Sequence, residues 1–173
     1  SNFTMPITGL AGYWTFDEGS GSVAGDYSGW ENTGTLAGAP VWISSCKAGG
    51  CISFSQPNDD YINVGDMTIS PFTSVSMAAW IKWDGVTQGG DAGIYYKNDS
   101  GLGALRITTA GTVFVQNGNG DFYSSAGAIS VNQWAHLVYV YDADVDQEYI
   151  YVDGLLVGQK ARSVALSQLA TPL

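Results

Sequence analysis

Short stretches of alternating side chains, separated by glycine-rich turns, limit the fold of this chain more than any other feature. In the stretches 136–141 and 148–152 bulky side chains recur at every second position, and the pair Asp153-Gly154 leads on into 155–158. A period of two is typical of β-strands, and an Asp-Gly pair between two such runs predicts a hairpin. Further runs follow with turn signals roughly every 8–12 residues, and no stretch has the period of a helix. The pattern predicts an all-β chain that folds as an antiparallel sandwich of two sheets.

The same alternation assigns the faces of the strands. Residues 72–83 are the longest strand candidate, with Val75 on one face and Trp80 on the other. We expect both of its faces to be covered, and Trp14, Trp80 and Trp134 to be core residues. The other candidate strands are 13–18, 41–43, 52–54, 59–64, 93–97, 105–108, 112–116 and 122–124.

Five blocks of the sequence resemble one protein family. They are YWTFDEGSG, DYSGWENTGTL, GGCISFSQPNDDYINV, FTSVSMAAWIKW, and NQWAHLVYVYD with YIYVDGLLVG. Their order and spacing are similar to those of laminin-G-like, concanavalin A-like jelly-roll domains of secreted and surface proteins. The similarity runs from residue 9 to the C-terminus, so we expect a jelly-roll domain at 9–173 after a leading segment at 1–8. Lectins, adhesion modules, accessory domains and glycosidases all share this fold, so the fold alone does not determine the function.

A cluster of oxygen-bearing side chains follows the first expected strand. The glycines of this loop allow tight turns and close backbone approach, and calcium is bound by six to eight oxygens of such groups. Domains similar to this one often hold a structural calcium near this corner. The alternative is that the side chains only cap turns and bind backbone amides. The candidate ligands are Asp17, Glu18, Asp26, Ser28 and Asn32.

The two cysteines, Cys46 and Cys51, enclose a short glycine-rich loop between two expected strands. A disulfide across this loop is our prediction, and it points to an extracellular or cell-surface location. A metal site would require further Cys or His ligands, which the sequence does not supply here. Two free thiols in a reducing compartment are the other alternative.

The charge balance limits the classes of partner. With 16 acidic and 6 basic residues the formal net charge is −10. The electric field of a protein with this negative charge repels phosphate groups. We therefore expect neither nucleic acid nor an anionic membrane surface as a partner, which leaves sugars, proteins and calcium. No apolar run approaches the ~20 residues of a membrane span.

Three aromatic residues are candidates for ligand contacts. Trp30 stands where the family usually has a small polar residue, so its indole either stacks on a sugar or a protein partner or folds back onto its own sandwich. Tyr95 and Tyr96 are adjacent, so in a strand one of them must face outward and can line a groove.

The ionisable residues give little support to catalysis. Glucanases of the same fold carry paired acids at alternate strand positions, as in the series Asp142, Asp144, Asp146 and Glu148. A retaining mechanism needs two carboxyl groups about 5 Å apart, but these lie at a hairpin tip without apolar residues to raise a pKa. We interpret them as a solvated turn. His136 is the only histidine, and we expect it to pack against or cap the sheet.

The resemblance also implies a further strand pair after residues 170–173, the last strand of which lies beside the opening strand. The sequence stops at Leu173, so the strand at 13–18 is expected to have an open edge. Strand addition by a neighbouring subunit would complete the sheet, unless the chain continues beyond Leu173.

Together these observations favour a non-catalytic extracellular module that binds a glycan or a surface protein within a larger surface protein or filament. A purely structural assembly subunit, and an accessory or catalytic domain of a glycoside hydrolase, stay open as alternatives.

Overall fold

The computed structural model describes residues 9–65, 67, 74–87, 90–97, 103–117 and 120–162. The chain divides into two compact units, residues 1–68 and 69–173. In the described residues every regular element is a β-strand except one short 3-10 turn, η1, at Gln56–Asn58. None of these residues belongs to a helix long and apolar enough to cross a membrane.

The first unit contains a three-stranded antiparallel sheet and one separate hairpin. The sheet has the strand order β1-β2-β5, and its strands are β1 (Val23–Ala24), β2 (Gly34–Ala37) and β5 (Tyr61–Asn63). The hairpin consists of β3 (Val41–Ile43) and β4 (Cys51–Ser53), with Trp42 opposite Ile52. The strands expected around the cysteine loop and at 59–64 are confirmed.

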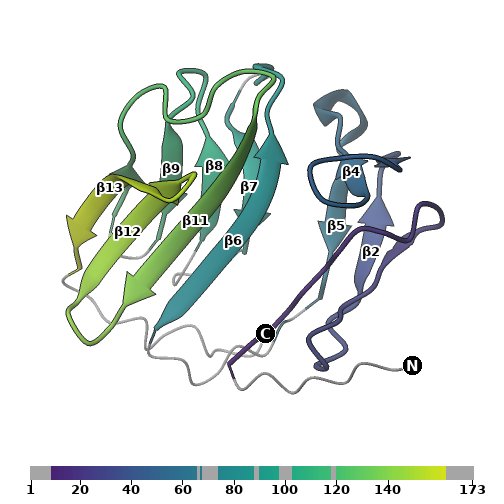
Figure 1. Cartoon of the computed structure of the whole chain (residues 1–173), viewed down its shortest axis with the longest axis horizontal. Helices are drawn as coiled ribbons and strands as arrows, with labels where there is room; N and C mark the ends of the chain where they lie inside the picture. Colours follow the sequence, from purple (N-terminus) through teal and green to yellow (C-terminus); the bar gives the residue numbers. More distant parts are fainter. Residues whose placement is uncertain are drawn as a thin grey trace. The chain divides into compact units, whose positions relative to one another are not determined.

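The second unit is a sandwich of two four-stranded antiparallel sheets, which lie one behind the other in Figure 1. The front sheet has the order β13-β12-β11-β6, with β6 (Val75–Lys82), β11 (Trp134–Asp142), β12 (Gln147–Val152) and β13 (Leu155–Ala161). The other has the order β10-β9-β8-β7, with β7 (Ala92–Tyr96), β8 (Ala104–Ile107), β9 (Val113–Gln116) and β10 (Phe122–Tyr123).

The core of this unit lies between the two sheets and follows from the alternation in the sequence. Along β11 every second side chain is buried, beginning with Ala135 and Leu137, because successive side chains of a strand point to opposite faces. Both sheets contribute buried side chains: Leu137, Tyr139, Tyr141, Ile150 and Val152 from one, and Leu105, Ile107, Val113, Val115 and Phe122 from the other. The predicted antiparallel sandwich is therefore confirmed.

Two details of the sequence interpretation are wrong. Residues 13–18 do not form the expected strand: within the described part of the chain the first strand is β1, and Phe16 has a φ of 59°, which an extended strand does not allow. The open strand edge expected there is absent, and self-assembly through a sheet edge stays a prediction. The further strand pair was expected to follow residues 170–173, and residues 163–173 lie outside the described part of the chain.

The tryptophans expected in the core are not fully buried. Trp14 and Trp134 are half-buried, and Trp80 is 45% exposed. On β6 the side chains of Val75 and its alternate neighbours point inward, so Trp80 points outward with Ser76. The buried tryptophan is Trp83, directly after β6.

Candidate functional site

The carboxylate of Asp26 organises the loop that follows β1. Its Oδ1 atom accepts hydrogen bonds from the backbone N–H groups of Tyr13 at 2.8 Å and Ser28 at 2.9 Å. Its Oδ2 atom accepts from the Ser28 hydroxyl at 2.7 Å and from the Asn32 N–H at 2.9 Å. One side chain thus binds three backbone N–H groups and one hydroxyl in two segments of the chain.

Further contacts tie this loop to the opening segment. The Asn32 side-chain amide donates to the carbonyl of Ala11 at 2.7 Å, and the indole N–H of Trp14 donates to the carbonyl of Asn32 at 3.0 Å. The backbone N–H of Tyr27 donates to the carbonyl of Tyr13 at 2.7 Å. The loop therefore has a defined conformation although it contains no strand.

Trp30 lies at the outer part of this loop. Its backbone N–H donates to the Ser28 hydroxyl at 3.2 Å, and its side chain is 66% exposed. The next residue, Glu31, has a φ of 59°, a conformation that non-glycine residues rarely adopt. Tyr13 and Tyr27 on the same loop assembly are also more than half exposed. The hydrogen bonds thus hold the backbone so that the Trp30 indole faces solvent.

The five predicted calcium ligands do not all come together. Asp26, Ser28 and Asn32 form the cluster just described, whereas Asp17 Oδ1 accepts from the backbone N–H of Gly50 at 2.6 Å. Glu18 Oε1 accepts from the N–H of Gly25 at 2.7 Å, and its Oε2 atom is buried with no hydrogen-bond partner in the described part of the chain. Among the described residues no three His, Cys, Asp or Glu side chains are grouped to hold a metal ion. Calcium binding therefore stays a prediction.

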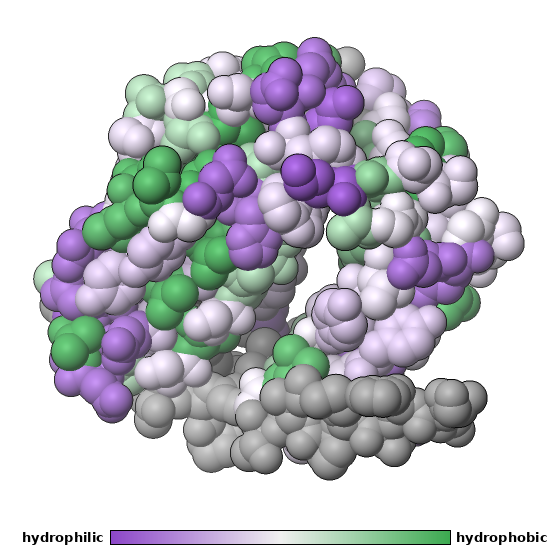
Figure 2. Space-filling view, in the orientation of Figure 1, coloured by the Kyte–Doolittle hydropathy of each residue, from purple (hydrophilic) through white to green (hydrophobic). Residues whose placement is uncertain are grey.

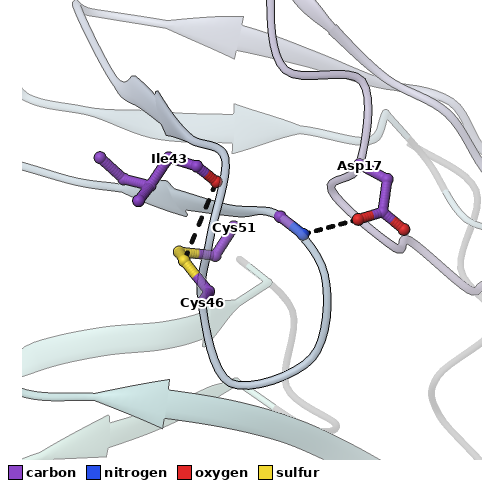
Figure 3. The surroundings of a disulfide bond; sticks show 5 residues. Asp17, Ile43, Cys46 and Cys51 are labelled. Atoms are coloured by element: carbon purple, nitrogen blue, oxygen red, sulfur yellow. Dashed lines mark hydrogen bonds between the residues drawn. A yellow bond between two sulfur atoms is a disulfide. The ribbon is translucent and has the colours of Figure 1, made fainter.

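The predicted disulfide joins Cys46 and Cys51 and closes the loop between β3 and β4 (Figure 3). The alternative of two free thiols is therefore excluded for this pair. Figure 3 also shows the Asp17 carboxylate reaching the backbone N–H at Gly50, next to Cys51. This bond links the segment after Trp14 to the cysteine loop.

The environment of Asp26 lowers its pKa below the ordinary value. Partial burial disfavours the charged form, but the hydrogen bonds from the Ser28 hydroxyl and from the N–H groups of Ser28, Tyr13 and Asn32 outweigh that cost. Since the folded-state pKa is depressed, the stabilisation is complete above the unfolded-state value, about 4, and is lost as the pH falls through the folded-state pKa.

We expect Asp26→Asn to loosen the Trp30 loop at neutral pH. The amide nitrogen cannot accept two of the four hydrogen bonds, so the first unit should lose about 1–2 kcal/mol of stability. Thermal unfolding at pH 7 measures this loss, and the difference from the wild type should shrink as the pH falls below about 4. Asp59→Asn is the matched control, because it removes the same charge from an exposed turn. Equal effects of the two variants at pH 7 would contradict the assigned role of Asp26.

The tyrosine pair on β7 divides as expected. Tyr95 packs against the core of the second unit, whereas Tyr96 is 66% exposed, with the Arg106 guanidinium 5.7 Å from its ring centroid. Tyr96 therefore stays a candidate for ligand contact, and Tyr95 is a core residue.

A buried polar cluster was missed by the sequence interpretation. Glu148, expected in a solvated turn, is fully buried, and its Oε1 atom lies 2.7 Å from Nη1 of Arg162. The same oxygen accepts from the Asn117 side chain at 2.6 Å and from the Tyr139 hydroxyl at 3.0 Å. Burial, together with the negative charge of Glu148, raises the pKa of Tyr139. The carboxylate is paired with a cation, whereas a retaining glycosidase needs a second carboxylate about 5 Å away.

Comparison with known protein families agrees with this architecture. Residues 56–173 match the family model described as the concanavalin A-like lectin/glucanases superfamily. Searches of curated proteins and of solved structures gave no significant match. The loop that carries Trp30 lies before the matched range, so its role has to be argued from its own geometry.

Proposed function

Because the chain belongs to the concanavalin A-like lectin/glucanases superfamily, we propose that it is a non-catalytic extracellular module that binds glycans, with Trp30 as its main contact. We place it within a larger surface protein or filament.

The exposed indole of Trp30, held by the hydrogen bonds around Asp26, is the observation that carries this proposal. A flat aromatic ring can cover the C–H face of a pyranose, and aromatic residues supply much of the contact energy at interfaces. A backbone that is already fixed loses little conformational entropy on binding, which favours affinity. The strained φ of Glu31 fits this view, because such strain persists where the surrounding structure enforces a functional geometry.

The hydrogen bonding of the acidic side chains supports a role without catalysis. Asp17, Glu18 and Asp26 each accept backbone N–H groups of the first unit, and Glu148 is paired with Arg162. A carboxylate that holds structural hydrogen bonds is poorly suited to attack a sugar or to transfer a proton. The extracellular placement is supported by the disulfide.

A glycan array with the whole chain, followed by titration of the best ligand, tests the proposal. We expect Trp30→Ala to weaken binding about tenfold or more, because a stacking contact is lost. Tyr61→Ala serves as the matched control, since Tyr61 is a similarly exposed ring on a strand of the same unit. Equal affinity of the wild type and Trp30→Ala for every bound glycan would refute the role of Trp30.

The same array, repeated with a chelator, separates the remaining alternatives. Loss of binding with the chelator, and its return with added calcium, would support a calcium-dependent site at the Asp26 loop. A chain that binds no glycan under either condition but self-associates in solution would instead be an assembly subunit.

A further inference from the structure

The outward face of the β6–β11 strand pair carries two tryptophans, a lysine and the only histidine of the chain. In the antiparallel register Lys82 lies opposite Trp134, and Trp80 lies opposite His136. Directly opposite side chains on one face of a sheet lie about 5 Å apart at Cβ, so these four form a compact square. The Trp80 and His136 rings are in contact, with their centroids 5.1 Å apart. We call Lys82, Trp134, Trp80 and His136 the ring square.

Aromatic side chains continue from the ring square onto the next strand. Tyr149 and Tyr151 lie on the outward face of β12, with ring centroids 6.1 Å apart. Tyr151 is opposite Val138, two residues after His136. Figure 2 views this sheet from its outward side, where apolar and moderately polar side chains cover much of the surface. Aromatic rings thus lie on the outward face of three neighbouring strands.

Polar groups on this face have unused hydrogen-bonding capacity. Within the described residues the side chains of Lys82, His136, Tyr149 and Tyr151 take part in no hydrogen bond or ion pair. An ammonium, an imidazole and two phenols therefore point outward between apolar rings. A ligand that matches them needs both C–H surfaces and hydrogen-bonding groups, and a saccharide has this combination.

The charge at the ring square differs in sign from that of the chain as a whole. The chain has a net charge of −10, yet the square contains a lysine and a histidine and no carboxylate. The acids nearest in sequence and register each accept a backbone N–H group: Asp84 that of Val86 at 2.9 Å, and Asp153 that of His136 at 2.9 Å. Asp153 lies beside His136, so Lys82 is the cation best placed to meet an anion.

We infer that the ring square is a second binding site, specific for acidic saccharides such as uronic acid oligomers. In this arrangement a pyranose ring stacks on Trp80 while its carboxylate pairs with Lys82, and Tyr149 and Tyr151 contact neighbouring sugar units. A nucleic acid would require several basic side chains along its phosphates, and the ring square contains a single lysine. The site uses residues other than those of the Trp30 loop, so it does not depend on the function proposed above.

A matched pair of ligands tests this inference: trigalacturonic acid and its methyl ester, in which esterification removes the carboxylate charges and adds a methyl group at each. Calorimetric titration of the whole chain should show binding of the acid that is about threefold or more tighter than binding of the ester, with a preference that weakens as salt is added. Lys82→Gln should remove the preference while the ester binds as before. Lys97→Gln, which removes the same charge from the end of β7, should leave the preference intact.

The aromatic contact is tested by Trp80→Ala and Trp80→Phe. We expect the alanine variant to weaken binding of both ligands about tenfold and the phenylalanine variant to retain most of it. Trp30→Ala should change neither affinity, which separates this site from the Trp30 loop. Equal affinities for acid and ester, a preference that survives Lys82→Gln, or absence of binding to both ligands would each overturn the inference.

Discussion

Replacing Arg162 with leucine is expected to destabilise the second unit by about 3–5 kcal/mol. The guanidinium and the Glu148 carboxylate are both almost fully buried and lie 2.7 Å apart. Without Arg162 the carboxylate stays buried with only the neutral donors Asn117 and Tyr139. The stacking of Arg162 on Tyr141, at 4.8 Å from its ring centroid, is lost as well. Urea unfolding at pH 7 of wild type and variant measures the change.

The double variant Glu148→Leu with Arg162→Leu is the control for this prediction. Replacing both members of a buried ion pair by apolar side chains is often nearly neutral, so the double variant should be more stable than Arg162→Leu alone. Exposed ion pairs contribute less than about 1 kcal/mol to the free energy of unfolding. A loss of this size in Arg162→Leu would show that the two charges are solvated.

Replacing Ile150 with alanine should cost about 2–5 kcal/mol, because it leaves a cavity between the two sheets. Ile150 is fully buried on β12, opposite Tyr139 on one side and Gly158 on the other. Ile150→Val removes a single methylene group from the same place and should cost about 0.5–1.5 kcal/mol. The measurement is again urea unfolding. Equal stability of the alanine variant and the wild type would mean that β12 does not face the core described here.

Much of the second unit could be predicted from the sequence, because its strands carry their own signals. The alternation in β11 and β12 and the turn at Asp153-Gly154 are local features, and they gave the hairpins and the sandwich. The disulfide was predictable for the same reason, since Cys46 and Cys51 lie five residues apart.

The failures concern properties that depend on distant residues. Residues 13–18 alternate as a strand does, but hydrogen bonds from Tyr27 and to Asp26 place them in an irregular segment. Glu148 follows a run of acids and therefore looks like part of a solvated turn. In the structure it pairs with Tyr141 on the neighbouring strand, and its buried carboxylate contacts Arg162. Neither partner could be inferred from the local sequence.

The candidate sites were predicted in part. Exposure of Trp30 was one of two alternatives, and the choice depended on the four hydrogen bonds to Asp26, which no pattern of residue types reveals. Trp80 was assigned to the core because both faces of its strand were expected to be covered. Its position on the same face of β6 as Ser76 was the signal that it points outward.

The central claim is that this chain binds glycans through exposed rings and does not cleave them. The most direct test is to incubate the purified chain with the best glycan of the array and to analyse both the bound fraction and the products. The account predicts saturable binding, weakened in Trp30→Ala, with the glycan recovered intact after prolonged incubation. Shorter fragments released by the wild type and not by a Glu148→Gln variant would contradict it, because they would assign catalysis to a carboxylate that is interpreted here as structural.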